Sequence, residues 1–306
     1  MKRLVTRSDF DGLVCAMMLK QLNLIDDIKF VHPKDVQDGK VELSENDITT
    51  NLPFDPRVGL AFDHHESEVL RNKDVKTEGK YIIDPHAKSA ARVVYEYYGG
   101  KKTFPMISDD LMTAVDKGDS ADFTIDEILN PKGWPLLNYI MDPRTGLGRF
   151  HDFRISNYDL MMELIDHCLN HSIDEIMELP DVKERTDLYF KQAKLFEEQI
   201  RRIAKVEGKV IVIDLRNEDV IYAGNRFMIY AMYPETEISV HVAWGFKKQN
   251  TAVMIGKSIV NRSSKVDIGK ICLSYGGGGH MNAGTCQLAN DVVDGELPNI
   301  IKKLNQ

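Results

Sequence analysis

Short apolar runs alternate with helical patterns through the first half of the chain. The runs predict strands at Arg3–Thr6, Ile28–His32, Asp47–Thr50, Gly59–Phe62 and Tyr81–Ile83. Between and after them, the patterns predict helices at Gly12–Leu22, Ser89–Tyr98 and Asp109–Asp116. Strands that alternate with helices are typical of βα units, in which the strands pair in parallel. The first half is therefore predicted to be an α/β domain built on a mostly parallel sheet.

A helical pattern follows, from Asn157 to about Val206. Its apolar positions recur at spacings of four and three, at Tyr189, Ala193, Phe196, Ile200 and Ile203. The charged residues between them are typical of a solvent-exposed face rather than of a nucleic-acid contact. We interpret this helix as the connector between two domains.

After Gly208 the runs become rich in Val, Ile, Tyr and Phe, which favour strands. Strands are predicted at Lys209–Leu215, Arg226–Tyr233, Ile238–Trp244 and Ala252–Ser258. A helix is predicted over Asp267–Leu273, just before a run of glycines. These elements predict a second, smaller α+β domain of about a hundred residues, a usual size for a domain.

The composition agrees with two domains of a soluble protein. A chain of 306 residues has room for two cores, and 43% hydrophobic with 28% charged residues is ordinary. No apolar stretch is long enough to span a bilayer, and the N-terminus lacks the apolar segment of a signal peptide, so a cytoplasmic protein is expected. The four cysteines lack zinc or disulfide spacing. The net charge of −8 disfavours binding to long duplex nucleic acid but leaves small anionic substrates open.

Two polar clusters follow predicted strands. Asp9 and Asp11 follow the first strand, and Asp63, His64 and His65 follow the fourth. Ligands of open α/β sheets bind at the carboxyl ends of strands, so both clusters are expected to face one crevice. Oxygen and imidazole ligands without thiolates favour manganese or magnesium over zinc. The clusters therefore predict a divalent-metal site.

A third cluster lies near the other end of the chain, where Gly276–Gly279 precede His280. Consecutive glycines permit backbone N–H groups to approach an anion closely. A flexible turn with a surface histidine is the alternative interpretation. Together with the carboxylates and histidines, the glycines indicate metal-assisted attack on phosphorus.

At these residues the sequence resembles the DHH phosphoesterase superfamily over nearly its whole length. The matching segments read SDFDG at 8–12, NLPF at 51–54, DHH at 63–65 and RSS…GGGGH at 262–280. The resemblance implies a DHH domain over residues 1–180, a helical connector over 181–207 and a DHHA1 domain over 208–306. It also implies a metal-dependent phosphohydrolase that cleaves phosphodiester bonds of short oligonucleotides or dinucleotides by metal-activated water.

The resemblance also implies roles for individual residues. Four of them match the family's metal ligands, namely Asp9, Asp11, His64 and Asp119. Asp116, one helical turn before Asp119, is the alternative ligand. Asp63 is expected to orient a histidine, and His65 to stabilise the developing charge or to protonate the leaving oxygen.

Two positions depart from the family pattern. The histidine of the first motif corresponds to Val5, and the bridging aspartate corresponds to Asn51. Valine cannot bind a metal, and a neutral amide is a poor bridge between two ions. We therefore predict one tightly bound ion, manganese or alternatively magnesium, and a second ion that is weak or absent. His32 is the first candidate for a missing ligand.

In the second domain the resemblance implies substrate contacts, at Arg262, Ser264, Gly277, Gly278, Gly279 and His280. Arginine binds phosphate through two N–H groups, and this domain is expected to close over the crevice. The expected partner is a small phosphorylated substrate, whether a short oligonucleotide, a dinucleotide or polyphosphate. No membrane contact is expected, and a homodimer is compatible with the sequence.

Three functions stay open on this basis. Phosphodiester hydrolysis is the leading hypothesis, and exopolyphosphatase-type phosphoanhydride hydrolysis is an alternative within the same chemistry. Stacking platforms would favour nucleotide bases, whereas several cations would favour polyphosphate. The third hypothesis is a non-hydrolytic phosphate-ligand binding protein with a degenerate metal site, for which Val5 and Asn51 are the support.

Overall fold

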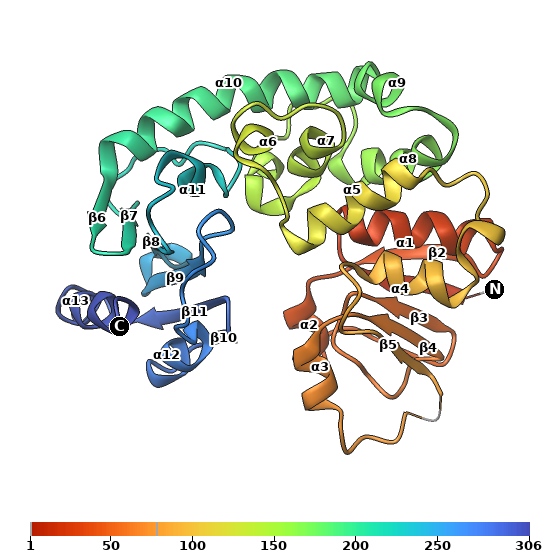
Figure 1. Ribbon diagram of the computed structural model, residues 1–306, viewed down its shortest axis with the longest axis horizontal. Helices are drawn as coiled ribbons and strands as arrows, with labels where there is room; N and C mark the ends of the chain where they lie inside the picture. Colours follow the sequence, from red (N-terminus) through yellow and green to blue (C-terminus); the bar gives the residue numbers. More distant parts are fainter. Residues whose placement is uncertain (1, 78) are drawn as a thin grey trace. The chain divides into compact units, whose positions relative to one another are not determined.

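In the computed structural model, which describes residues 2–77 and 79–306, the first five strands form one parallel sheet (Figure 1). Its strands are β1 (Lys2–Thr6), β2 (Ile25–Phe30), β3 (Asp47–Thr50), β4 (Leu60–Asp63) and β5 (Tyr81–Ile83). They lie in the order β2-β1-β3-β4-β5, and every pair is parallel. The predicted α/β architecture is confirmed, because all five expected strands are present.

The second strand shows the largest shift from its predicted position. It ends at Phe30, whereas the prediction extended it to His32. His32 instead caps the short helix α2 (Pro33–Gln37), where its Nδ1 accepts a hydrogen bond from Lys34 N at 3.2 Å. The proline at the first helical position favours this helix start.

Helices cover this sheet and extend beyond it. The three that matter for the site are α1 (Phe10–Gln21), α4 (Ala90–Tyr97) and α5 (Asp109–Ser120), which contact one another. The remaining helices up to residue 203 are α3 (Glu66–Arg71), α6 (Ile125–Leu129), α7 (Gly133–Met141), α8 (Asn157–Asn170), α9 (Ile173–Met177) and α10 (Pro180–Ile203). Short 3-10 turns lie at Gly100–Lys102, Pro143–Thr145 and Leu147–Arg149. Helix α1 is buried from Phe10 to Leu19, so it is a core element of this part of the chain.

The chain divides into two units, and the division falls inside α10. Unit 1 contains the residues up to Asp122 together with Pro131–Leu188. Unit 2 contains Phe123–Asn130 and Tyr189–Gln306. The domain boundaries at residues 180 and 208 stay predictions.

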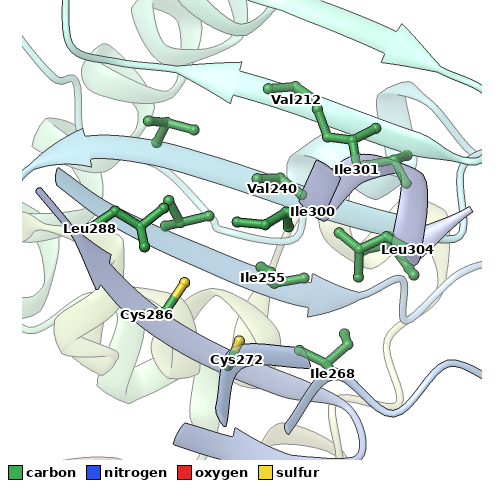
Figure 2. Packing of buried hydrophobic residues seen from close by; sticks show 14 of the residues in the cluster. Val212, Val240, Ile255, Ile268, Cys272, Cys286, Leu288, Ile300, Ile301 and Leu304 are labelled. Atoms are coloured by element: carbon green, nitrogen blue, oxygen red, sulfur yellow. The ribbon is translucent and has the colours of Figure 1, made fainter. Parts of the chain in front are cut away.

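Unit 2 is built on a six-stranded sheet in the order β10-β11-β9-β8-β7-β6. The strands are β6 (Ala204–Glu207), β7 (Val210–Asp214), β8 (Ile238–Trp244), β9 (Thr251–Lys257), β10 (Gly278–His280) and β11 (Ala283–Leu288). Its helices are α11 (Met228–Met232), α12 (Ile268–Ser274) and α13 (Val293–Leu304), with a 3-10 turn at Phe246–Lys248. Figure 2 shows the core, in which Ile300 and Ile301 of α13 meet Val240 and Ile255 of the sheet.

Two predicted elements of unit 2 were wrong. Arg226–Tyr233, predicted as a strand, contains helix α11 (Met228–Met232), whose first N–H groups bond to Asn225 and Phe227. A short, continuous apolar run does not distinguish a buried helix from a buried strand. The helical connector, predicted to reach residue 207, ends at Ile203, and Ala204–Glu207 pair antiparallel with β7 instead.

Within the described part of the chain, no helix combines the length and the apolar character needed to cross a membrane.

Candidate metal centre

Three side chains from separate elements of unit 1 bring ligand atoms together. Asp11 lies in the first turn of α1, His64 directly follows β4, and Asp119 lies in the last turn of α5. Their ligand atoms all lie within 4.8 Å of one another. All three are among the four residues that the resemblance gave as metal ligands, and the fold brings their ligand atoms together.

Asp11 is held in place by the protein from several directions. Its carboxylate is only 2% exposed and accepts hydrogen bonds from Ala91 N at 2.7 Å and Ala90 N at 3.2 Å, at the start of α4. The Asn51 Nδ2 donates to Asp11 Oδ2 at 2.7 Å. The amide groups at a helix N-terminus favour a negative charge. The carboxylate is therefore oriented by the fold itself.

The imidazole of His64 is oriented for a metal by its second nitrogen. Its Nδ1 lies 3.2 Å from Ala87 O, and since a carbonyl only accepts, Nδ1 carries the hydrogen and Nε2 offers its lone pair in the neutral ring. Nε2 lies 2.8 Å from Asp119 Oδ2 but makes no well-formed hydrogen bond, so this is a charge contact. Asn51 Oδ1 is a second buried polar atom without a hydrogen-bond partner. Buried donor atoms without partners are what a metal ion would satisfy.

The charges around the triad also favour a cation. Burial, and then the charge of Asp119, raise the pKa of Asp11. Burial opposes the charged form of His64, but Asp119 and Asp11 outweigh it and raise the pKa of His64 to about 9. A divalent ion would stabilise the charged form of Asp11, the carboxyl whose pKa burial and Asp119 raise. The residues present therefore fit a divalent metal.

Asp63 is buried beneath the two histidines. It is fully buried, and its Oδ1 accepts hydrogen bonds from His64 N at 2.8 Å and from His65 Nδ1 at 2.7 Å. Tyr81 OH donates to its Oδ2 at 3.3 Å. The hydrogen bond that His65 donates to Asp63 raises the pKa of His65. This geometry makes Asp63 a positioning residue for His65, whose side chain is 43% exposed and whose Nε2 is the atom left for a substrate.

Among the described residues, a second group of possible ligand atoms is formed by Asp63, His64 and His65, and Asp9 and Asp116 belong neither to it nor to the triad. Asp9 caps α1 through Gly12 N at 3.0 Å. Asp116 accepts from Ser89 Oγ at 2.7 Å and forms an ion pair with Arg92 at 2.6 Å. The alternative ligand Asp116 thus supports the start of α4, and the geometry favours Asp119. A ligand role for Asp9 stays a prediction.

Val5, the position equated with a histidine of the family, is a core residue. It is fully buried in β1 and packs in a hydrophobic cluster with Val36, Leu52 and Val58. A histidine there would insert a polar ring into this core rather than complete a metal site. His32, suggested by the sequence as the compensating ligand, is in neither group of candidate ligand atoms in the described chain.

Sequence reasoning missed two arginines beside the carboxylates. Arg7 Nε lies 3.0 Å from Asp9 Oδ2. Arg144 forms an ion pair with Asp142 at 2.8 Å, and its charge weakly opposes the rise that burial causes in the pKa of Asp9. Arg7 was visible within the first motif, two residues before Asp9, whereas nothing in the local sequence points to Arg144.

A cavity of about 180 Å³ opens in unit 1 next to the first motif. Ser8, which adjoins Asp9, contributes to its wall. The other lining residues are mostly apolar and come from α7, α8 and the turns between them, namely Ile140, Met141, Pro143, Gly148, Leu160, Met161 and Leu164 with Asp142, Asn157 and Arg185. A mostly apolar wall with a few polar groups is typical of a small-ligand site.

In unit 2 the predicted substrate contacts have structural roles of their own. Gly278–His280 form β10, the edge strand of the sheet, and pair with β11. A Cβ at Gly277 would lie 2.2 Å from Thr285 O, and one at Gly279 would lie 2.3 Å from Ala283 O. Close packing therefore requires these two glycines, whereas Gly278 has open space around it. Arg262 is exposed and Ser264 is buried, and their contact with a substrate stays a prediction.

The chain is similar to proteins of known structure. It is similar to the solved structure of a pGpG-specific phosphodiesterase, PggH, from Vibrio cholerae, with 57% sequence identity and a TM-score of 0.86. That match covers 100% of this chain and 99% of the other. The DHH-domain structure of a protein assigned to a family of ribosomal proteins matches at 13% identity and a TM-score of 0.54, covering 100% and 87%, and shows the fold alone. No family model and no curated protein matches the chain.

The relationship to PggH extends over both units and includes the triad and the DHH segment within the matched length. An identity of 57% over complete chains indicates common descent rather than a shared fold alone. The chain therefore belongs to the DHH phosphoesterase superfamily and is a metal-dependent phosphodiesterase.

Proposed function

We propose that this enzyme hydrolyses the linear dinucleotide pGpG to two molecules of GMP, with a manganese ion held by Asp11, His64 and Asp119. The observation that carries the proposal is this buried triad, whose ligand atoms lie within 4.8 Å of one another and in which Ala87 O holds Nδ1 of His64. The specificity of PggH, a relative of equal length, supports the choice of substrate. Magnesium would occupy the same oxygen and imidazole ligands less favourably, because magnesium prefers oxygen ligands.

Each residue around the triad has a defined task in this reaction. A divalent ion supplies Lewis acidity at the phosphoryl group and acidifies water when it is bound. Asp63 accepts the Nδ1 hydrogen of His65 at 2.7 Å and so fixes the orientation of the ring. The Nε2 of His65 then delivers a proton to the leaving oxygen. Asp11 and His64 keep their orientation through Ala91 and Ala87.

The substrate is best identified with a defined panel. Purified protein with manganese is given pGpG, pApA, longer linear oligonucleotides, a cyclic dinucleotide and polyphosphate. The expected result is that kcat/KM for pGpG exceeds that for every other compound, since the relative is specific for pGpG. Preferential release of orthophosphate from polyphosphate would instead support the exopolyphosphatase alternative.

Removal of metal is expected to abolish the hydrolysis. An excess of EDTA should reduce the rate on pGpG to background, and added manganese should restore it, because the ion activates the attacking water. The rate of phosphate ester cleavage is measured by chromatography before and after re-addition. Equal rates with and without EDTA would contradict the metal mechanism.

We infer that the cavity beside Ser8 accepts one base of the substrate. Its apolar wall suits a flat heterocycle, and it adjoins the motif that carries Asp9 and Asp11. A Cβ at Gly148 meets only Asn157 Nδ2, at 3.9 Å, so a larger side chain fits there without a backbone clash.

Substitution at Gly148 is expected to test the cavity. Gly148→Leu should raise the KM for pGpG roughly tenfold by filling part of the space, an effect of about 1.4 kcal/mol. Gly148→Ala, the matched control, should change KM far less, and both variants should bind manganese as the parent does. An unchanged KM in Gly148→Leu would place the base elsewhere.

The finer properties of the partner and location are also proposals. Four buried, free cysteines suit a reducing compartment, so we propose that the enzyme acts in the cytoplasm. The negative net charge supports a preference for short over long duplex nucleic acid. A homodimer stays a prediction, which size-exclusion chromatography with light scattering would test.

A further inference from the structure

Both carboxylate oxygens of Asp9 already have partners in the protein. Oδ1 accepts a hydrogen bond from Gly12 N at 3.0 Å, which caps α1. Oδ2 lies 3.0 Å from Arg7 Nε. The two side chains are partly shielded from water, with 13% of Asp9 and 26% of Arg7 exposed. Asp9 thus meets a cation of the chain itself at the oxygen that could otherwise bind a metal ion.

The carboxylate of Asp11, two residues further along the chain, also has a partner within the protein. Asp11 Oδ2 accepts a hydrogen bond from Asn51 Nδ2 at 2.7 Å. Asn51 holds this position with a φ of 55°, in the left-handed region that asparagine tolerates better than most residues. A buried backbone in this region is maintained by its surroundings. An amide donor therefore takes one oxygen of Asp11, as the guanidinium takes one oxygen of Asp9.

The charge of Arg7 also acts beyond its direct partner. Burial raises the pKa of Asp9, and Arg7 opposes that rise. Burial would raise the pKa of Asp119 too, but His64 and, more weakly, Arg7 hold it below its usual value. Arg7 thus stabilises negative charge on one carboxylate outside the triad and on one within it.

We propose that the guanidinium of Arg7 takes the place of a second metal ion, so that this centre pairs one divalent ion with one fixed cation. This inference rests on the proposed function, because it assigns the charge that a second ion would supply in phosphodiester cleavage. Its basis is geometric, since Arg7 lies 3.0 Å from one oxygen of Asp9 and Asn51 donates a hydrogen bond to one oxygen of Asp11. Val5, at the position of the family's histidine, belongs to the hydrophobic core and takes no part in this arrangement of charges.

A guanidinium suits this role for chemical reasons. It keeps its charge at all physiological pH values and presents N–H donors in a plane that matches a phosphate. Nε of Arg7 lies 3.0 Å from Asp9 Oδ2 as an ion pair, while the terminal amino groups of Arg7 have no hydrogen-bond partner within residues 2–77 and 79–306. Those groups are available to a nonbridging phosphate oxygen beside the metal triad.

The test counts manganese ions per chain at several concentrations of free ion, by equilibrium dialysis with elemental analysis. The parent protein and Arg7→Lys, which keeps the positive charge, are expected to bind one ion. Arg7→Gln removes the charge and Arg7→His adds a metal ligand, so both should bind a second ion at least about tenfold more tightly than the parent does. Arg57→Gln, which removes another arginine paired with an aspartate two residues away, is the matched control and should bind one ion.

A second variant shows which carboxylate the extra ion uses. Asp9→Asn in the Arg7→Gln background should return the count to one ion, because the carboxylate released by the first substitution is gone. Thermal unfolding of every variant verifies that the fold is retained. Two equally tight ions in the parent, or a single ion in both Arg7→Gln and Arg7→His, would overturn the inference.

Activity provides an independent measure. On pGpG, Arg7→Gln should lower kcat by about 10²–10³-fold, the usual effect of removing one charge-stabilising donor, and Arg7→Lys should recover part of the loss. Ion counts do not depend on the choice of substrate. If the ion counts change as expected while pGpG is not cleaved, the proposed substrate is wrong and the role of Arg7 is supported. If pGpG is cleaved but the ion counts do not change, the substrate is supported and the role of Arg7 is wrong.

Discussion

Replacing His64 with alanine is expected to remove metal binding and hydrolysis together. His64 Nε2 is the nitrogen ligand of the triad, and its Nδ1 is committed to Ala87 O at 3.2 Å. Loss of a residue that merely orients a metal ligand costs about 10–100-fold in affinity, so loss of the ligand itself should cost at least about 100-fold. Manganese content by elemental analysis and kcat on pGpG should fall in parallel.

The matched control for this experiment is His280→Ala. His280 belongs to β10 of unit 2, where its Nδ1 accepts a hydrogen bond from Asn282 N at 3.3 Å. This variant should retain its metal, and its KM should rise if His280 contacts the phosphate. Equal loss of metal in both variants would contradict a metal centre contained in unit 1.

Asp63→Asn is expected to separate catalysis from metal binding. Asp63 is fully buried and accepts the Nδ1 hydrogen of His65, so an amide in its place leaves the ring without a carboxylate partner. The comparable change in a serine protease triad lowers kcat about 10⁴-fold, and a loss of roughly 10²–10⁴-fold is expected here. The affinity for manganese should stay within about tenfold of that of the parent protein.

Tyr81→Phe is the control for that change. It removes only the long hydrogen bond of 3.3 Å to the other oxygen of Asp63, so kcat should fall by less than about tenfold. If Asp63→Asn lost its metal as completely as His64→Ala, Asp63 would be a metal ligand rather than a positioning residue.

The parallel sheet and the closeness of Asp11 to His64 could be predicted because strand ends impose strong geometric limits, whereas Asp119 came from the resemblance. Asp11 and His64 each follow a strand of one parallel sheet, and such ends meet at a single edge. Asp119 and Asp116 could not be separated by sequence, since both lie on one face of α5. The ion pair of Asp116 with Arg92, 24 positions earlier, decides between them.

The role of Val5 could not be predicted for a different reason. Strand β1 is buried on both faces, as Leu4 and Val5 are both fully buried, so the sequence does not reveal which side chain faces the ligands. The motif also contains a residue of the right charge at Arg7, but its contact with Asp9 depends on the turn into α1. Long-range contacts such as that of Asn51 with Asp11 leave no local signal.

Two different causes can produce a run of glycines, namely close packing of the backbone and contact with a phosphate. The absence of side chains at Gly277 and Gly279 is required by the close approach of β11, and a Cβ at Gly269 of α12 would lie 3.0 Å from the backbone of Gly279. Phosphate contact is therefore not needed to explain most of the run. Gly278 has open space around it on an edge strand, so packing does not require a glycine there, and its contact with phosphate stays a prediction.

Helix α10 belongs to two cores at once. Val182 and Arg185 are buried in the stretch that belongs to unit 1, and Tyr189 and Ile200 in the stretch that belongs to unit 2. A chain divided near residue 188 would deprive each half of a turn that its own interior needs. A gene fusion that gave either unit a new neighbour is therefore expected to carry the whole helix with it.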